Sequence, residues 1–199
     1  MLPPPIVLAS ASPRRRELLA ILGVQARIVP ADVDERVLPG EGAEALVARL
    51  AGDKARAVAE HCARDPIDRD HAPLVIGADT VVVIDGEILG KPTGPREARA
   101  FIERLAGRSH LVLTGHCLRR GDGSASRVVS TVVTFRELDE LDVQSYLASG
   151  EGEDKAGGYA IQGRGAGLVA AIEGCYSNVV GLSLPTVIAL ARSLGVRLA

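Results

Sequence analysis

The sequence predicts a mixed α/β fold in which one β-sheet is flanked by helices. Short apolar runs typical of strands alternate with segments of helical spacing, but without the strict strand–helix–strand rhythm of a parallel sheet. An Asp85–Gly86 pair between two apolar runs indicates a hairpin, which brings antiparallel pairing into the sheet. At 199 residues the chain can bury a substantial core, and we expect one domain over 1–199.

The first elements follow from local signals. Residues 6–10, IVLAS, predict a short buried strand. Ser12 followed by Pro13 predicts a helix start with serine as N-cap, and Gly23 predicts the end of that helix. A second strand is expected at 25–30, and it leads into an acidic segment.

A longer helix and a series of shorter elements follow. The helix is expected over 42–62, because apolar residues recur there at helical spacing: Ala45, Leu46, Ala48, Leu50, Ala55 and Val58. The remaining elements are a surface loop over 64–73, hairpin strands around 85–86, a helix over 95–107, strands over 110–120 and 126–138 joined by the turn 121–126, a helix over 138–150, a strand over 168–174, a loop, and a helix from Pro185 to about Leu194.

Composition excludes several kinds of partner. No run approaches the ~18 apolar residues that span a membrane, and the N-terminus lacks a signal peptide's pattern, which favours the cytoplasm. Cys62, Cys117 and Cys175 lie far apart, fit a reducing compartment and are expected as small buried hydrophobes. A net charge of −2 without tryptophan disfavours a polymeric nucleic acid, but leaves a small anionic ligand open.

Two polar segments near the N-terminus are candidates for a binding site. Ser10 and the stretch Ser12–Arg16 place hydroxyls and three arginines between a strand and a helix N-terminus, where free backbone N–H groups attract anions. Alone, this stretch is equally explained by a surface helix whose arginines extend into water. The acidic stretch 31–36 fits either a solvated turn or ligands for a divalent ion.

Two further segments carry unexplained polarity. Asp79 lies in a largely buried strand, where an isolated carboxylate is costly, so it is expected to be paired, to bind metal or to act in catalysis. A two-residue hairpin turn sets Thr80 opposite Lys91. The glycine-rich stretch 154–167, with Lys155 and Gln162, predicts a mobile loop whose backbone approaches a ligand closely. His110 and His116 alternate with apolar residues in a predicted strand and are assigned structural or surface roles, not catalytic ones.

These segments together indicate a site for a polyphosphate and a divalent metal. The quoted motifs are SASPRRREL at 10–18, VDE at 33–35, AGDKA at 51–55, GADTVVVIDGEILGKP at 77–92, DKAGGYAIQGRGAG at 154–167 and SNVVGLSLP at 177–185. In order, and over nearly the whole chain, they resemble the Maf family of nucleoside triphosphate pyrophosphatases.

The resemblance implies hydrolysis between the α and β phosphates, which yields a nucleoside monophosphate and pyrophosphate. It implies two lobes around a central cleft, similar to inosine triphosphate pyrophosphatases, and a homodimer. Asp79 matches the proton acceptor, and Glu35 would hold Mg²⁺ or Mn²⁺ with it, while Lys91 belongs to the catalytic set. The positions that face the triphosphate are matched by Ser10, Arg15, Lys54, Lys91 and Lys155.

The resemblance also implies a substrate. Arg14, Thr80 and Gln162 match the positions that separate branches of the family, and this combination is that of the branch acting on dTTP and UTP. A glutamine amide can donate and accept, as the edge of uracil or thymine requires. Two alternatives stay open: a nucleotide-binding regulator of cell division without turnover, and a pyrophosphatase for modified pyrimidine nucleotides. Arg16 is expected to be an ordinary surface residue.

Overall fold

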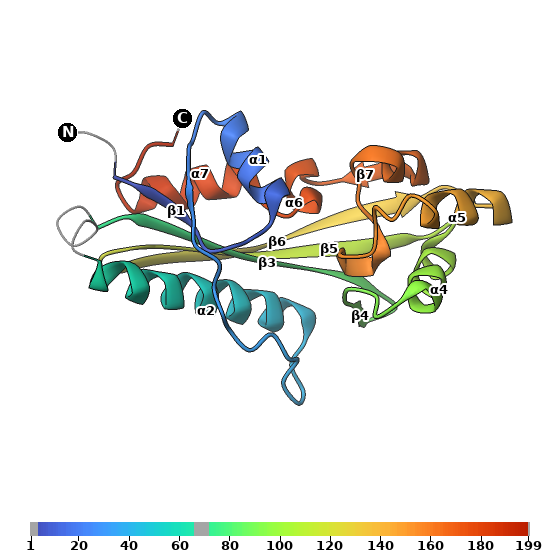
Figure 1. The fold of residues 1–199 in the computed structure, drawn as a ribbon, viewed down its shortest axis with the longest axis horizontal. Coiled ribbons are helices and arrows are strands. Elements are labelled where there is room, and N and C mark those ends of the chain that lie inside the picture. The colour runs from blue at the N-terminus through green and yellow to red at the C-terminus, as the bar shows by residue number, and fades with distance from the viewer. Residues whose placement is uncertain (1–3, 66–71, 199) are drawn as a thin grey trace. The chain divides into compact units, whose positions relative to one another are not determined.

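The computed structural model describes residues 4–65 and 72–198 of the chain (Figure 1). The strands are β1 (Ile6–Leu8), β2 (Arg27–Ile28), β3 (Leu74–Ile84), β4 (Glu87–Leu89), β5 (Ser109–Arg120), β6 (Gly123–Phe135) and β7 (Val169–Glu173). The α-helices are α1 (Pro13–Ile21), α2 (Ala43–Arg64), α4 (Pro95–Leu105), α5 (Glu140–Leu147), α6 (Tyr176–Val180) and α7 (Leu184–Ser193), and two short 3₁₀ helices are η1 (Ala156–Gly158) and η2 (Gly163–Leu168).

The strands form one sheet with both kinds of pairing. Its order is β2-β1-β3-β5-β6-β7, and β4 pairs with β3 outside this path. β1 is parallel to both β2 and β3, with Val7 opposite Arg27 on one side and Val75 on the other. β4 and β7 are antiparallel to β3 and β6. The predicted mixed sheet with flanking helices is therefore confirmed.

The chain divides into two compact units. Unit 1 contains Met1–Asp79, Thr114–Val129 and Gly181–Ala199, and unit 2 contains Thr80–Leu113 and Ser130–Val180. The boundaries fall within β3, β5 and β6, so each of these strands contributes to both units. The predicted cleft between two lobes stays a prediction.

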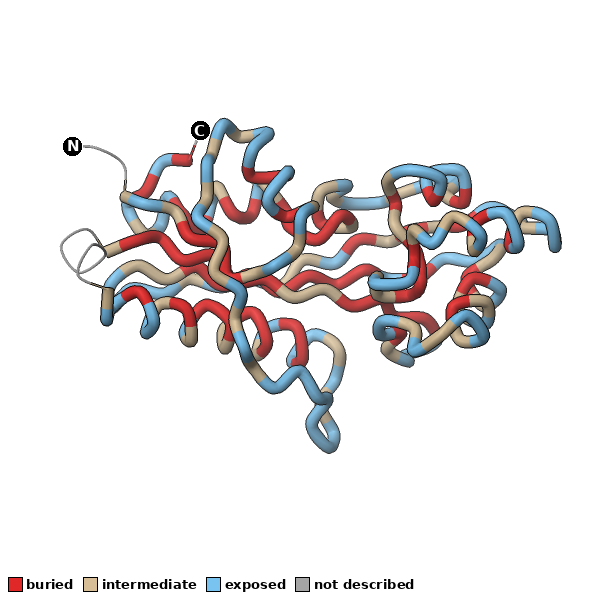
Figure 2. Tube along the Cα trace, in the orientation of Figure 1, coloured by how far each residue is buried: buried red, intermediate tan, exposed pale blue. Residues whose placement is uncertain are grey.

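In unit 1, helices cover both faces of the sheet. α2 lies along one face, and α1 and α7 lie on the other (Figure 1). The buried side of α2 faces the strands (Figure 2) and consists of Leu46, Val47, Leu50, Ala51, Lys54, Ala55, Val58 and Cys62. Ala45 and Ala48, which the helical spacing assigned to the apolar face, are exposed instead. The charged residue Lys54 lies on the buried face, so packing and not hydropathy decides this side of the helix.

In unit 2, the glycine-rich stretch is folded into η1 and η2. α4 packs against η1 and α5, and η2 contacts β7. A Cβ added to Gly157, at φ +69, would lie 2.9 Å from Val82, so this glycine is needed both for its backbone angle and for its close contact with β3. The predicted loop is thus a packed segment with two short helical turns, in which Gly157, Gly158 and Gly165 are buried.

Several local predictions are confirmed and others need correction. α1 begins at Pro13, but the Ser12 side chain makes no capping hydrogen bond. The β5–β6 turn is only residues 121–122, because 123–126 continue β6. The predicted loop before the last helix contains α6. Among the described residues, Cys62 and Cys117 are buried, whereas Cys175 is half-buried. Part of the predicted loop 64–73 lies outside the described residues, which omit 66–71.

No helix within residues 4–65 and 72–198 is long and apolar enough to cross a membrane.

Candidate active site

The structure distributes the predicted site residues over both units. Unit 1 holds Ser10, Arg14, Arg15, Glu35, Lys54 and Asp79, and unit 2 holds Thr80, Lys91, Lys155 and Gln162. The unit boundary falls between the consecutive residues Asp79 and Thr80.

The turn between β1 and α1 is organised by Arg15. Its side chain is buried and donates from Nε to the carbonyl oxygen of Gly181 at 2.8 Å. From Nη1 it donates to Ser10 Oγ at 3.1 Å and to the carbonyl oxygen of Ala78 at 2.8 Å. Ser10 Oγ also accepts the backbone N–H of Ser12, at 3.2 Å. Arg15 thereby ties the strand–turn–helix segment to β3 and to the start of the C-terminal segment.

The three consecutive arginines differ in burial, and the prediction that Arg16 is a surface residue is confirmed. Arg16 is exposed, Arg14 is half-buried and Arg15 is buried. Burial lowers the pKa of the Arg15 guanidinium, and the negative charge of Asp79 acts in the opposite direction. Since a guanidinium stays charged, Arg15 brings a fixed positive charge into the site.

Lys54 forms ion pairs with Glu35 and Asp79, the two carboxylates of the predicted site. Its Nζ lies 2.7 Å from Asp79 Oδ1 and 2.5 Å from Glu35 Oε1. The Lys54 and Asp79 side chains are 9% and 13% exposed, whereas that of Glu35 is 54% exposed. The high cost of burying an ionised group is offset here by direct pairing with hydrogen-bond geometry. We call Arg15, Glu35, Lys54 and Asp79 the charge cluster.

Gly77 and Gly115, which are not among the predicted site residues, set the position of Lys54. A Cβ added to Gly77 on β3 would lie 2.8 Å from the backbone N of Ala55 and closer still to the carbonyl oxygen of Ala51. A Cβ added to Gly115 on β5 would lie 3.0 Å from the backbone N of Ala48. The backbone of α2 therefore rests directly on two strands, which brings Lys54 to Asp79. Glycine inside a predicted strand is the sequence signal for such a close approach.

The donor set of the charge cluster fits a divalent metal of the magnesium type. The described residues, 4–65 and 72–198, contain no group of three or more His, Cys, Asp and Glu side chains arranged for a metal. Mg²⁺ is commonly held by one or two carboxylates together with phosphate oxygens and water. Glu35 and Asp79, which converge on one cation already, match that pattern, whereas a metal that needs a complete protein cage does not.

In unit 2, the hairpin is confirmed but is shorter than predicted. Asp85 and Gly86 have φ values of +54 and +78, as a type I′ turn requires. The ladder runs from the pair Ile84–Glu87 to the pair Val82–Leu89, where β4 ends. It therefore does not reach the predicted pairing of Thr80 with Lys91.

The two lysines of unit 2 lie on neighbouring segments. The backbone N–H of Gly157 donates to the carbonyl oxygen of Gly90 at 3.0 Å, which joins η1 to the end of the hairpin. Lys91 follows Gly90 and is exposed, and Lys155 directly precedes η1 and forms an ion pair with Asp154. Unit 2 thus brings Lys91 and Lys155 to one region through a backbone contact.

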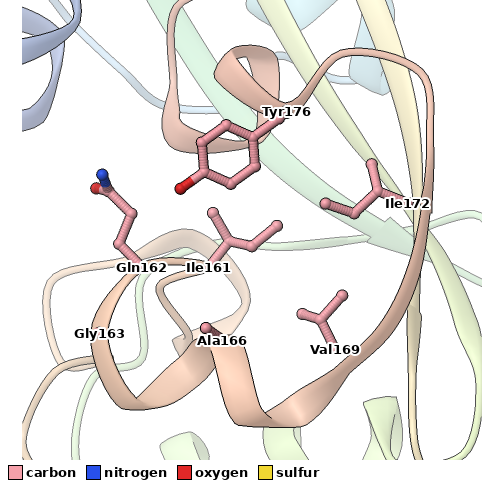
Figure 3. A pocket seen from close by; sticks show the side chains of 7 residues that line it. All are labelled: Ile161, Gln162, Gly163, Ala166, Val169, Ile172 and Tyr176. Carbon is pink, nitrogen blue, oxygen red and sulfur yellow. The ribbon is translucent and has the colours of Figure 1, made fainter.

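Gln162 lies at the rim of a hollow of about 440 Å³ in unit 2 (Figure 3). The hollow is lined by Ile161, Gln162, Gly163, Ala166, Val169, Ile172 and Tyr176. Figure 3 shows the polar ends of Gln162 and Tyr176 on one side and the side chains of Val169 and Ile172 on the other. Gln162 is a site residue predicted from the sequence, whereas Tyr176 is not, although aromatic residues are rare in this chain.

The segment that carries Gln162 is fixed at both ends. Tyr146 Oη accepts the backbone N–H of Ala160 at 3.0 Å. Glu151 Oε2 accepts the backbone N–H groups of Arg164 at 2.8 Å and Gly165 at 3.3 Å. A carboxylate at the start of η2 satisfies donors that would otherwise lack partners. The position of Gln162 is therefore determined by side chains that precede it in sequence.

Comparison with known proteins finds relatives that match nearly the whole chain. The family model described as Maf-like protein matches residues 5–194. A dTTP/UTP pyrophosphatase of Anaeromyxobacter sp. (strain Fw109-5) is 49% identical over 195 residues, which cover 96% of this chain and 89% of the relative. The protein of the same name from Myxococcus xanthus (strain DK1622) is 49% identical over 97% of this chain and 94% of its own length. That from Geobacter sp. (strain M21) is 46% identical over 96% and 95%.

Proposed function

This chain belongs to the family of Maf-like proteins, and on that premise we propose that it is a nucleoside triphosphate pyrophosphatase acting on dTTP and UTP. The bond broken is the one between the α and β phosphates, and the products are the monophosphate and pyrophosphate. The relatives at 46–49% identity that carry the name dTTP/UTP pyrophosphatase support this activity. The observation that carries the mechanism is the buried Lys54 ammonium between Glu35 and Asp79, beside Arg15.

In the proposed mechanism, Asp79 is the general base. Its carboxylate accepts a proton from a water molecule as the water oxygen bonds to phosphorus and the bridging P–O bond breaks. The released electron pair leaves on pyrophosphate. Lys54 orients the Asp79 carboxylate through the 2.7 Å contact at Oδ1. Lys54 and Arg15 supply positive charge where negative charge develops.

Glu35 and Asp79 would hold a Mg²⁺ or Mn²⁺ ion. When bound, such an ion neutralises charge on the phosphate oxygens and stabilises the leaving pyrophosphate. The exposed position of Glu35, at 54%, leaves this carboxylate accessible to an ion that arrives with the nucleotide.

The other site residues are assigned to binding. Ser10, Lys91 and Lys155 would contact the triphosphate, whose negative charge needs cations beyond those of the charge cluster. Arg15 would add charge there while its three hydrogen bonds hold Ser10 in place. Arg14, Thr80 and Gln162 would select the base, through the resemblance to the dTTP/UTP branch. The same resemblance supports a homodimer.

Turnover on a nucleotide panel tests the proposal. Purified protein with Mg²⁺ or Mn²⁺ is assayed for pyrophosphate release from dTTP, UTP, dCTP, CTP, ATP and GTP, and from nucleoside triphosphates with modified pyrimidine bases. We expect dTTP and UTP to give the highest kcat/KM. A stoichiometric nucleotide complex without pyrophosphate release would instead favour a regulatory binding protein. A strong preference for a modified pyrimidine would move the assignment to that substrate.

A further inference from the structure

The hollow in unit 2 has a composition that the phosphate chemistry does not require. Ile161, Val169 and Ile172 give it an apolar wall, while Gln162 and Tyr176 are its polar residues (Figure 3). A triphosphate would gain nothing from such a wall, because it binds through cations and backbone N–H groups. The lining is instead that of a site for a flat ring with a polar edge.

Tyr176 is unlike the other two tyrosines of the chain. Tyr146 and Tyr159 are 4% and 5% exposed, and each hydroxyl has a hydrogen-bond partner inside unit 2. Tyr176, by contrast, is 49% exposed at the start of α6. An exposed tyrosine ring beside an apolar wall presents a π-face on which a nucleobase can stack.

Gln162 complements this ring at the rim of the hollow. Its amide offers a donor and an acceptor, which matches the adjacent N3–H and carbonyl oxygen of thymine or uracil. The bonds of Tyr146 to Ala160 and of Glu151 to Arg164 hold the backbone on either side of Gln162. Because the backbone on either side of Gln162 is already held, binding through its amide orders little further backbone.

We propose that this hollow is the base subsite and that Tyr176 is its stacking residue, with Gln162 reading the edge of the pyrimidine. The inference rests on the proposed function and extends it to a specificity-determining residue outside the charge cluster. A volume of about 440 Å³ accommodates a single pyrimidine ring with its neighbouring sugar.

Steady-state kinetics provide the first test. Tyr176→Ala removes the ring, and we expect KM for dTTP and UTP to rise roughly tenfold, as the loss of one base–aromatic stack predicts, with kcat within twofold of wild type. Tyr176→Phe keeps the ring and should retain a near-normal KM. Leu141→Ala, which truncates another exposed side chain of unit 2, is the matched control and should change neither constant. An unchanged KM in Tyr176→Ala overturns the proposal, as does a fall in kcat alone.

A binding measurement separates this subsite from the hydrolytic activity. The chain has three tyrosines and no tryptophan, so protein labelled at the tyrosine ε carbons gives three ring signals by NMR. Thymidine, which has no phosphate, should shift the signal that is absent from Tyr176→Phe and leave the other two in place. If thymidine shifts no ring signal while wild-type protein hydrolyses dTTP, the base subsite is wrong and the activity stands. If thymidine shifts the Tyr176 signal but no nucleotide is hydrolysed, the subsite stands and the activity is wrong.

Discussion

The two units hold their candidate site residues in opposite ways. In unit 1 the cationic side chains themselves are buried and paired: Lys54 contacts two carboxylates, and Arg15 donates to two carbonyl oxygens and a hydroxyl. In unit 2 the backbone is fixed, by Tyr146 and Glu151, while Gln162 is half-buried and Tyr176 is exposed. The first arrangement suits charge chemistry, where exclusion of water strengthens each interaction. The second suits recognition, where side chains must be free to meet a ligand.

This difference predicts where substitutions act. A change in the charge cluster leaves a buried charge with a lost partner and should reduce the chemical step or the stability by a large factor. A change at the surface of unit 2 should mainly alter affinity and selectivity.

The largest effect is expected for Asp79→Asn. The amide keeps an oxygen that can accept from Lys54, but it cannot take a proton from water, so kcat should fall by roughly 10²- to 10⁴-fold. Pyrophosphate release measures this, and a thermal melt checks the fold. Asp53→Asn, one residue before Lys54 on α2 and paired with Arg56, is the matched control and should retain wild-type turnover. Wild-type turnover in Asp79→Asn would show that the assigned base is wrong.

Gly77→Ala tests whether the contact of α2 with the sheet positions Lys54. The added methyl would press on the backbone at Ala51 and Ala55, and overpacking of this kind costs about 1–3 kcal/mol or more. We expect Tm to fall by roughly 5–10 °C. In Gly52→Ala, on the same helix, the methyl meets nothing within 4 Å, and helix propensity should raise stability by about 1 kcal/mol. Equal melting temperatures for the two variants would contradict the close contact.

Among the described residues, each unit buries a neutral histidine, and the pH dependence of stability tests both. In unit 1, His116 accepts the backbone N–H of Ser183 at 2.8 Å, and in unit 2, His110 Nε2 lies 2.8 Å from Tyr159 Oη. Burial lowers the pKa of both imidazoles to about 4. Between pH 6.5 and about 4 the unfolded chain binds protons that the folded chain does not. The free energy of unfolding should therefore decrease as the pH is lowered through this window.

Urea unfolding at a series of pH values measures this loss, which should amount to roughly 3 kcal/mol for each histidine. His110→Phe should remove about half of the pH dependence, whereas His61→Gln, at an exposed position, should leave it intact. An equal pH dependence in His110→Phe and wild type would show that His110 is not held neutral.

The smallest effect is expected for Glu151→Ala. Loss of the carboxylate frees the backbone N–H groups of Arg164 and Gly165, so the segment that carries Gln162 becomes less well positioned. We expect the preference for dTTP over GTP in kcat/KM to weaken by a few-fold, with kcat for dTTP nearly unchanged. The neighbouring exposed Glu153→Ala should behave as wild type. A loss of kcat without a loss of selectivity would mean that Glu151 supports the fold rather than recognition.

The sequence alone determined the features that depend on a few neighbouring residues. The starts of α1 and α4 follow from proline at the first helical position, and their ends from Gly23 and Gly107, whose positive φ values no β-branched residue adopts easily. The Asp85–Gly86 turn likewise carries its own backbone angles. The order of the site motifs was sufficient for the resemblance to the Maf family, which the match over residues 5–194 confirms.

Only the tertiary structure decided which site residues come into contact with one another and with distant parts of the chain. Arg15 donates to the carbonyl oxygen of Gly181, 166 positions away. Lys54 is buried because the backbone of α2 packs against Gly77 and Gly115. Neither contact leaves a periodic signal, since a charged residue on an apolar face breaks the helical pattern that predicts burial. No local sequence signal predicts Tyr176 as a site residue either. Its place in the hollow depends on how η2, β7 and α6 pack in unit 2. Long-range packing fixes these positions, because the partners that stabilise them are brought together only when the chain folds.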